Sequence, residues 1–446
     1  MERYTDHTIR GNTITILAQI AVNRDVKLIV SVIAIELAML LFAASKGLAE
    51  AFLPVTGTLM VFSVITCLFT FYANADKTLT IIVLMLLNIG FLVQQIQNGT
   101  EGSSKSFLIK MAASMIAATA GTLFYTRMKD WFRRPFAIAV LVIAQYAICA
   151  VMIIYGQLIG SAEGQGARIQ LSGITPFELV KVMYILTAAG LTGRSSGAEK
   201  LLLLHTVILS FCFVICSELG TLLIIWTVGI LAIWMFGKHR KTAGILLAAS
   251  GAGAGIFWVL SDKLLLPMIT ENPGIFPGVI AKLVSRFGAA VHPELYINGY
   301  GYQSIRGLQA ISMGGWFGIE TERYRMPLPE CINDFIFANV IQTCGLLIGF
   351  IVIILFLIFL RRGSAISDTC RSEYYRRVAF MITATITLEA IIHIGYNIAA
   401  LPVTGIPLYF VSQGFTALTT GMLLTGMLLV ISADKNTETE LNYEIG

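Results

Sequence analysis

The sequence predicts an all-α, polytopic membrane protein with about twelve transmembrane helices and one long extracellular loop. Of the 446 residues, 56% are hydrophobic and only 13% are charged. The mean hydropathy is +0.79. Soluble domains carry about 25% charged residues, whereas a lipid bilayer accepts exposed apolar side chains without penalty. The composition therefore excludes a water-soluble enzyme, a disordered chain and a disulfide scaffold.

The charge of the chain does not indicate a nucleic-acid partner. The formal net charge is +5, but the basic residues are spread over short loops between apolar runs and form no single patch. The seven cysteines show no spacing typical of a metal site. We therefore expect neither nucleic-acid binding nor a cysteine-based metal centre.

Apolar runs of roughly 17 to 25 residues, each bounded by polar residues, predict the spans in order. They cover residues 26–47, 52–73, 78–97, 107–125, 135–159, 176–193, 200–217, 219–236, 242–260, 336–360, 378–400 and 407–432. The gap around Glu218 is barely one turn long. It predicts either a very tight loop or a break within the membrane.

Lysine and arginine gather in one set of alternate loops, which places those loops in the cytoplasm. These loops contain Arg127 to Arg134, Arg194 to Lys200, Lys238 to Lys241 and Arg361 to Arg377. The other loops are nearly free of positive charge. Both termini are therefore predicted to be cytoplasmic.

This count divides the chain into four regions. Residues 1–25 form a cytoplasmic segment, 26–73 a first transmembrane pair, 78–432 the main transmembrane domain and 433–446 an acidic cytoplasmic tail. The main domain contains an extracellular loop, 261–335, which is too long to be a mere connector. Apolar positions between 279 and 287 predict a short amphipathic helix at the membrane surface within this loop.

Several ionisable or polar residues fall inside the predicted spans, where a charge is costly and usually either pairs or marks a pathway. Glu178 and Lys181 share one helix face after Pro176, and Glu218 lies at the tight break. A further stripe, spaced i, i+4, i+8 on one helix, consists of Glu389, His393 and Asn397. Two interpretations fit these groups, either interhelical networks that fix the packing or a polar cavity reached from the outer face.

Asp334 marks the point where the polar loop becomes an apolar helix. A carboxylate there fits a helix cap. It also fits a catalytic base at a membrane-edge cavity, where it would take a proton from a sugar hydroxyl. Basic residues or a metal ion would then neutralise a departing lipid pyrophosphate.

Five motifs, in order along the chain, resemble the SEDS family (shape, elongation, division and sporulation: FtsW, RodA and SpoVE). They are Pro176-Phe177-Glu178 with Lys181; Glu218-Leu219-Gly220-Thr221; Tyr302-Gln303 with Ala310 to Gly318; Leu328-Pro329-Glu330 with Asp334 to Ala338; and Asn397 with Leu401 to Leu408 and Phe410-Val411-Ser412. Together they span about residues 166 to 432, and the joint match is highly specific.

The resemblance implies a peptidoglycan glycosyltransferase of the bacterial plasma membrane, acting in cell shape or cell division. It would polymerise lipid II at the outer face, release undecaprenyl pyrophosphate and work beside a class B penicillin-binding protein. Asp334 falls on the family's loop aspartate and would be the base, or a metal-binding group, that activates the acceptor GlcNAc hydroxyl. Residues that would orient substrate are Arg168, Glu178, Lys181, Glu218, Arg286, Arg306 and Glu330. No cofactor is firmly implied, and a divalent cation, Mg²⁺ or Mn²⁺, stays open.

The chain departs from the family pattern at several positions. The Trp that usually follows the Arg at position 168 is Ile169, and Ile332-Asn333 replace the loop His-Thr. Glu218 replaces an Asp, and two extra spans precede the usual ten. Two alternatives therefore stay open. One is a non-catalytic scaffold for a penicillin-binding protein, which the missing Trp favours and the retained Asp334 does not. The other is a flippase of a lipid-linked sugar, although the two halves show no inverted repeat.

Overall fold

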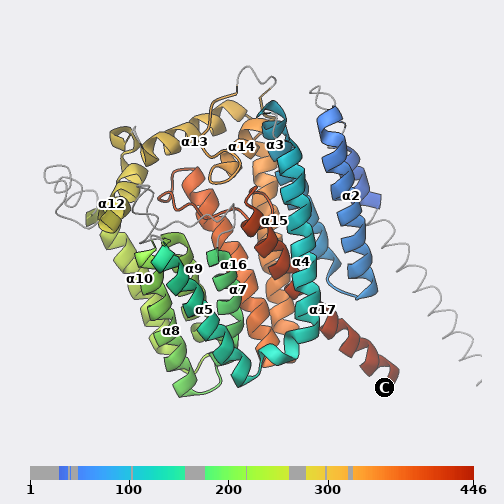
Figure 1. The fold of residues 1–446 in the computed structure, drawn as a ribbon, viewed down its shortest axis with the longest axis vertical. Coiled ribbons are helices and arrows are strands. Elements are labelled where there is room, and N and C mark those ends of the chain that lie inside the picture. The colour runs from blue at the N-terminus through green and yellow to red at the C-terminus, as the bar shows by residue number, and fades with distance from the viewer. Residues whose placement is uncertain are drawn as a thin grey trace, which may run out of the picture.

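The computed structural model describes residues 30–38, 41, 49–101, 104–155, 176–216, 218–260, 278–296, 299–319 and 325–445. Within these ranges the chain is almost entirely helical and contains no strand. The predicted all-α membrane fold is confirmed. Figure 1 shows a bundle of roughly parallel helices with α12 and α13 lying across one end, which we call the α12–α13 end.

A helical stretch at residues 30–38 comes first, and the named elements follow it in chain order. They are α2 (Ala49–Tyr72), α3 (Lys77–Glu101), α4 (Ser104–Phe132), α5 (Pro135–Tyr155), α7 (Pro176–Leu191), α8 (Ser196–Ile215), α9 (Leu219–Phe236), α10 (Arg240–Leu260), α12 (Gly278–Val291), the 3₁₀ turn η3 (Pro293–Tyr296), α13 (Tyr300–Gly314), α14 (Ile336–Cys344), α15 (Leu346–Thr369), α16 (Glu373–Asn397) and α17 (Phe415–Ile445).

Nine helices of the described ranges are long and apolar enough to cross a membrane. They are α3, α4, α5, α8, α9, α10, α15, α16 and α17. The predicted first span is described only at residues 30–38 and 41, and the apolar part of α2 is short, at Thr56–Tyr72. The short interruption predicted around Glu218 is present, since α8 ends at Ile215 and α9 begins at Leu219. The predicted helix near 279–287 is α12.

The predicted span at 336–360 is wrong as a continuous helix, because it breaks at Gly345 into α14 and α15. Gly345 has φ +90°, a conformation that an L side chain rarely adopts. The turn after α13 inserts beside this break. Leu346 N–H donates to the Gly315 carbonyl and Ile319 N–H to the Gln342 carbonyl, both at 2.9 Å. Backbone groups freed inside a membrane must find such partners within the protein.

The predicted span at 407–432 also begins in the wrong place. Residues 398–414 form an irregular segment, and α17 starts only at Phe415. Pro402 and Pro407 lack the N–H that a helix needs, which explains why the apolar run does not continue as a helix. At its other end α17 continues through the predicted acidic tail to Ile445, and Asp434 pairs with Lys129 of α4.

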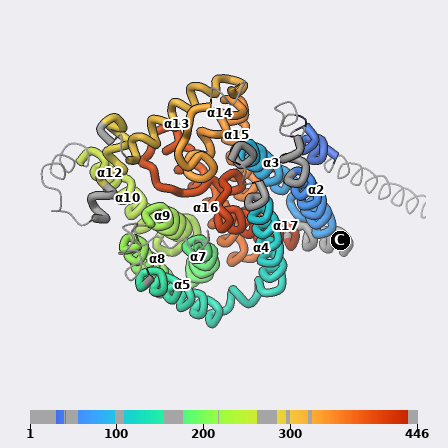
Figure 2. Tube along the Cα trace, turned by 45° about the horizontal axis from the view of Figure 1, so that its top comes forward, coloured from blue at the N-terminus to red at the C-terminus, as the bar shows by residue number. Residues whose placement is uncertain are grey.

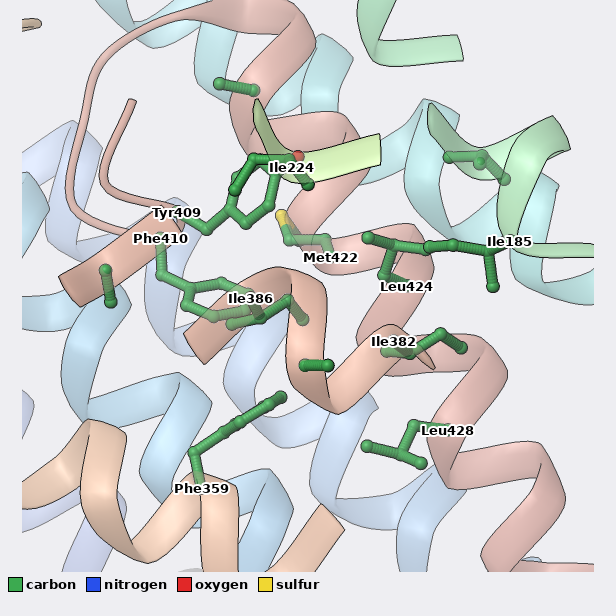
Figure 3. Close-up of a cluster of buried hydrophobic side chains, with 14 of the residues drawn as sticks. Ile185, Ile224, Phe359, Ile382, Ile386, Tyr409, Phe410, Met422, Leu424 and Leu428 are labelled. Carbon is green, nitrogen blue, oxygen red and sulfur yellow. The ribbon is translucent and has the colours of Figure 1, made fainter. Parts of the chain in front are cut away.

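The centre of the bundle is formed by α16 and α17, with α3, α4, α7, α9 and α15 around them (Figure 2). The membrane-length parts of α3, α16 and α17 are mostly buried, whereas that of α10 is almost wholly exposed. Figure 3 shows part of the apolar core, with Phe359 of α15, Ile386 of α16 and Met422 of α17 among the side chains drawn with Tyr409 and Phe410. The irregular segment 398–414, which contains Tyr409 and Phe410, packs on this core.

Substitution of Gly345 by Ala should lower the free energy of unfolding by about 1–3 kcal/mol. The new methyl group would have to adopt the left-handed φ and would collide with the Trp316 carbonyl oxygen. The thermal unfolding midpoint in detergent measures this loss. The matched control is Gly251→Ala on the exposed face of α10, where an added Cβ meets nothing within 4 Å. A Gly345→Ala midpoint equal to that of the control would contradict the prediction.

Candidate functional site

A polar cavity of about 770 Å³ lies near the α12–α13 end of the bundle. Helices α4, α7, α9, α12, α13, α16 and α17 contribute to its wall, together with the segments 325–335 and 398–414. Its charged lining residues are Lys110, Glu178, Lys181, Glu218, Arg286, Glu330, Asp334 and Glu389. Residues far apart in the sequence thus meet around one cavity within the membrane protein.

Most of the residues predicted to form a site do line this cavity. They are Glu178, Lys181, Glu218, Arg286, Glu330 and Asp334. The structure places Arg306 elsewhere, on α13, where its guanidinium lies 2.8 Å from the Met326 Sδ and over the Tyr302 ring at 5.1 Å. Arg168 lies outside the described residues.

A buried charge cluster forms the floor of the cavity. Pro176 opens α7 and puts Glu178 in its first turn, where the helix dipole favours a carboxylate. Lys181, one turn later, has its Nζ 2.7 Å from Oε1 of Glu178 and 2.7 Å from Oε1 of Glu389 on α16. The side chain of Lys181 is only 3% exposed, so this ammonium group depends on its two carboxylates.

Tyr409 completes the cluster from the irregular segment 398–414. Its hydroxyl donates a 2.7 Å hydrogen bond to Oε2 of Glu178, and its ring lies 5.2 Å from the Lys181 ammonium. Two carboxylates and one ammonium leave a formal charge of −1 on the cluster. Because Lys181 is already matched by both acids, it has little capacity left to bind an anionic ligand.

Glu389, His393 and Asn397 on α16 fit both interpretations left open by the sequence, a polar cavity and a network that fixes the packing. Glu389 lines the cavity, whereas His393 and Asn397 fix the irregular segments. His393 Nδ1 lies 2.8 Å from the Ile406 carbonyl oxygen. The three residues therefore tie α16 to α7, to segment 398–414 and, as described next, to segment 325–335.

Asn397 holds the backbone at Asp334. Its Nδ2 donates to the Asp334 carbonyl, and its Oδ1 accepts from the Ala338 N–H, each at 3.0 Å. The N-cap of α14 is Phe335, which makes no side-chain capping bond. Asn397 thus supplies from α16 the capping bond that the first turn of α14 needs. Asp334 precedes the cap and lines the cavity.

Segment 325–335 is also joined to segment 398–414. Gln413 N–H donates to the Ile332 carbonyl at 2.9 Å, and the Ser412 hydroxyl donates to the Asn333 carbonyl at 3.2 Å. On the other side, Arg325 Nη1 donates to Oδ1 of Asn339 in α14 at 3.0 Å. Asp334 is therefore anchored through its neighbours on both sides.

Sequence reasoning did not single out Lys110, which lines the cavity from α4. A signal was available, because Lys110 is a charged residue inside the predicted span 107–125. No such signal identified Tyr409 as a partner of Glu178, since the contact depends on the path of an irregular segment. In the described part of the chain, no three His, Cys, Asp or Glu side chains gather in a way that could hold a metal ion.

Comparison with protein families and curated proteins gives consistent matches. The model of the FtsW/RodA/SpoVE family, described as "cell cycle protein", matches residues 76–437. Stage V sporulation protein E of Bacillus subtilis is 26% identical over 378 residues, covering 80% of this chain and 97% of the relative. The probable peptidoglycan glycosyltransferase FtsW of the same organism is 26% identical over 345 residues, covering 74% and 81%.

Solved structures share the fold. The rod shape determining protein RodA of Thermus thermophilus superposes with a TM-score of 0.55 at 16% identity, covering 81% of this chain and 97% of RodA. A chain of a peptidoglycan synthase complex, whose structure concerns the coordination of polymerization and crosslinking, superposes with a TM-score of 0.58 at 16% identity and covers 81% and 98%.

Substitution of Lys181 by Met should destabilise the protein by about 3–5 kcal/mol, because it leaves Glu178 and Glu389 as neighbouring buried carboxylates without a cation. The thermal unfolding midpoint is the measurement. Lys200→Met, at an exposed position of α8, is the matched control. In a double variant, the further change Glu389→Gln should recover part of the loss. An unchanged midpoint for Lys181→Met would show that the cluster does not stabilise the fold.

Proposed function

We propose that this chain, which belongs to the FtsW/RodA/SpoVE family of cell cycle proteins, is a peptidoglycan glycosyltransferase that polymerises lipid II. It is a multi-pass bacterial membrane protein. The observation that carries the proposal is the cavity that brings Asp334 together with Lys110, Arg286 and the Glu178–Lys181–Glu389 cluster. Relatives that share most of their length with this chain are named peptidoglycan glycosyltransferases.

The proposed reaction is a single displacement at the MurNAc anomeric carbon of the growing glycan chain. The acceptor GlcNAc hydroxyl attacks this carbon, a C–O bond forms, and the bond to undecaprenyl pyrophosphate breaks. Asp334 takes the proton of the attacking hydroxyl. Because the pyrophosphate is already a good leaving group, no protein nucleophile is needed, and the proton and the developing negative charge are what the site has to manage.

Two cations of the cavity suit the leaving pyrophosphate. Arg286 is 94% buried by its surroundings, with a side chain that stacks over Tyr300 at 5.0 Å and a buried Nε that has no hydrogen-bond partner. Lys110 is exposed on the cavity side of α4, and no ion pair holds it among the described residues. Lys181 is the third cation, but its two carboxylates already neutralise it.

The donor set of the cavity does not form a preformed all-protein metal site. A Mg²⁺ or Mn²⁺ ion commonly uses one or two carboxylates together with substrate phosphates. Asp334 and Glu330 would hold such an ion if the pyrophosphate of the substrate supplied the remaining oxygens, and the ion would then supply further positive charge at the leaving group.

The location of substrate and partner follows from the same proposal. Because lysine and arginine gather in one set of alternate loops, we expect both termini in the cytoplasm and the α12–α13 end at the outer face of the plasma membrane. The structural relative that is part of a peptidoglycan synthase complex supports a cross-linking partner, which we expect to be a class B penicillin-binding protein.

Asp334→Asn should lower the rate of lipid II polymerisation by about 10²–10⁴-fold, because it removes the proton acceptor while keeping the size of the side chain. The measurement is glycan synthesis from labelled lipid II by the full chain in liposomes, with and without the penicillin-binding partner. Glu294→Gln, an exposed carboxylate of η3 away from the cavity, is the control. Full activity of a folded Asp334→Asn variant would assign the base elsewhere. A wild-type chain that binds lipid II but never polymerises it would favour the scaffold.

Lys110→Gln should weaken binding of undecaprenyl pyrophosphate by about 10-fold to 100-fold, the range expected when one charge-assisted hydrogen bond is lost. Binding of undecaprenol, which lacks the phosphates, should not change. Titration of both lipids against the purified protein gives the two affinities, and Lys241→Gln at an exposed position of α10 is the control. Equal loss for both lipids would mean that Lys110 contributes to packing and does not bind the pyrophosphate.

A further inference from the structure

A buried carboxyl group lies far from the cavity lining, at the junction between the helical stretch 30–38 and the bundle. Glu36 is 0% exposed and belongs to the part of the chain that precedes the region matched by the family model, residues 76–437. Val32, one turn earlier, is also buried, whereas Val30, Leu37 and Leu41 are exposed. The stretch therefore turns one face, with Glu36 on it, toward the bundle and presents apolar side chains outward.

Two neighbouring helices supply polar partners for Glu36. The Ser63 hydroxyl of α2 donates to Oε1 of Glu36 at 2.5 Å. Asn88 of α3 places its Nδ2 3.5 Å from the same oxygen. Ser63 and Asn88 are themselves buried, at 0% and 2% exposure. Three helical segments thus meet at one small, buried polar cluster.

The cluster contains two acceptors that lack a donor. Neither Oε2 of Glu36 nor Oδ1 of Asn88 has a hydrogen-bond partner, and both atoms are buried. Exchanging Oδ1 and Nδ2 of the Asn88 amide would not satisfy the acceptors, because Nδ2 in its present place donates to the Leu84 carbonyl at 2.8 Å. One amide hydrogen is used there and the second points to Glu36 Oε1. The amide oxygen can then be satisfied only by an additional donor.

A proton on Glu36 would satisfy both atoms at once. A neutral carboxylic acid has one O–H donor beside its acceptor oxygen, and an amide has the complementary pair. Oε2–H of Glu36 would donate to Oδ1 of Asn88 while Nδ2–H of Asn88 donates to Oε1 of Glu36. We propose that Glu36 is a membrane-embedded proton-binding site and that this acid–amide pair locks the segment 30–38 onto α3.

The electrostatic surroundings agree with a neutral acid. The charged residues of α3 are Lys77 and Glu101, at its two ends, and α2 contributes only Glu50, near its start. The titratable side chain that faces Glu36 from α2 is Cys67, one turn beyond Ser63 and also buried. An ionised Glu36 would have no cation from these helices, and an unpaired charge inside a membrane protein is costly.

The contrast with the catalytic cavity is sharp. Glu178 and Glu389 are also buried, but the Lys181 ammonium lies 2.7 Å from an oxygen of each. The same chain therefore contains two kinds of buried glutamate, one kind paired with an ammonium and one with an amide. This difference provides an internal standard for the experiment.

Hydrophobic carbodiimides react with neutral carboxylic acids inside membranes and leave carboxylates unmodified. The full-length protein in liposomes, treated at pH 7, should be modified at Glu36, whereas Glu178, which lies 2.7 Å from the Lys181 ammonium, should stay unmodified in mass spectra of the peptides. Modification should disappear as the pH is raised. Absence of modification at Glu36 in folded protein would overturn the proposal. If sodium, but not choline, protects Glu36 from modification, the site binds a metal cation and not a proton, and the proposal is also overturned.

Two substitutions test the lock itself. Glu36→Gln keeps an acceptor and a donor in the same places and cannot ionise, so its thermal midpoint should match that of wild type at pH 7. At alkaline pH the midpoint of wild type should fall, whereas that of Glu36→Gln should not. Glu36→Ala removes both bonds and should lower the midpoint at every pH. If Glu36→Gln is as unstable as Glu36→Ala, the carboxylate form is what the site needs and the proposal fails. None of these readouts depends on glycosyltransferase activity.

Discussion

Lipid offers no hydrogen-bond partners, so each place where a helix stops inside this bundle has to find its donors and acceptors in the chain itself. At Gly345 the turn after α13 supplies them, through the Gly315 carbonyl and the Ile319 N–H. At the first turn of α14 the Asn397 side chain supplies them. At both of these described breaks, the freed backbone groups thus find partners within the chain.

This constraint also builds the cavity. Asp334 lies in one irregular segment and Tyr409 in another, and polar side chains of α16 bond to the backbone of both segments. The same helix adds Glu389 to the buried charge cluster. Successive turns of α16 thus hold the irregular segments and line the cavity. A change in the position of α16 would move Asp334 and the buried charge cluster together.

Much of the fold follows from the sequence, because lengths of apolar runs and the distribution of basic residues report directly on membrane crossing. The break at Gly345 does not follow from the sequence, since apolar residues continue on both sides of it. The backbone groups freed there find partners in the turn at Gly315, which is distant in the sequence. The candidate site was predicted where a charge stands out inside an apolar run, as at Glu178. Pairing of Lys181 with Glu389, 208 residues away, depends on helix packing that no local spacing encodes.

Two of the departures from the family pattern fall where the backbone, and not the side chain, makes the contact. Ile332 and Asn333 replace the usual pair before Asp334, yet both hold segment 398–414 through their carbonyl groups. Gln413, the partner of Ile332, contributes its backbone N–H to this contact. Tyr409, in the same segment, donates a hydrogen bond to Glu178 and so ties the segment to the charge cluster. The geometry around Asp334 is thus maintained by interactions that tolerate these changes, which favours a working glycosyltransferase over an inactive scaffold.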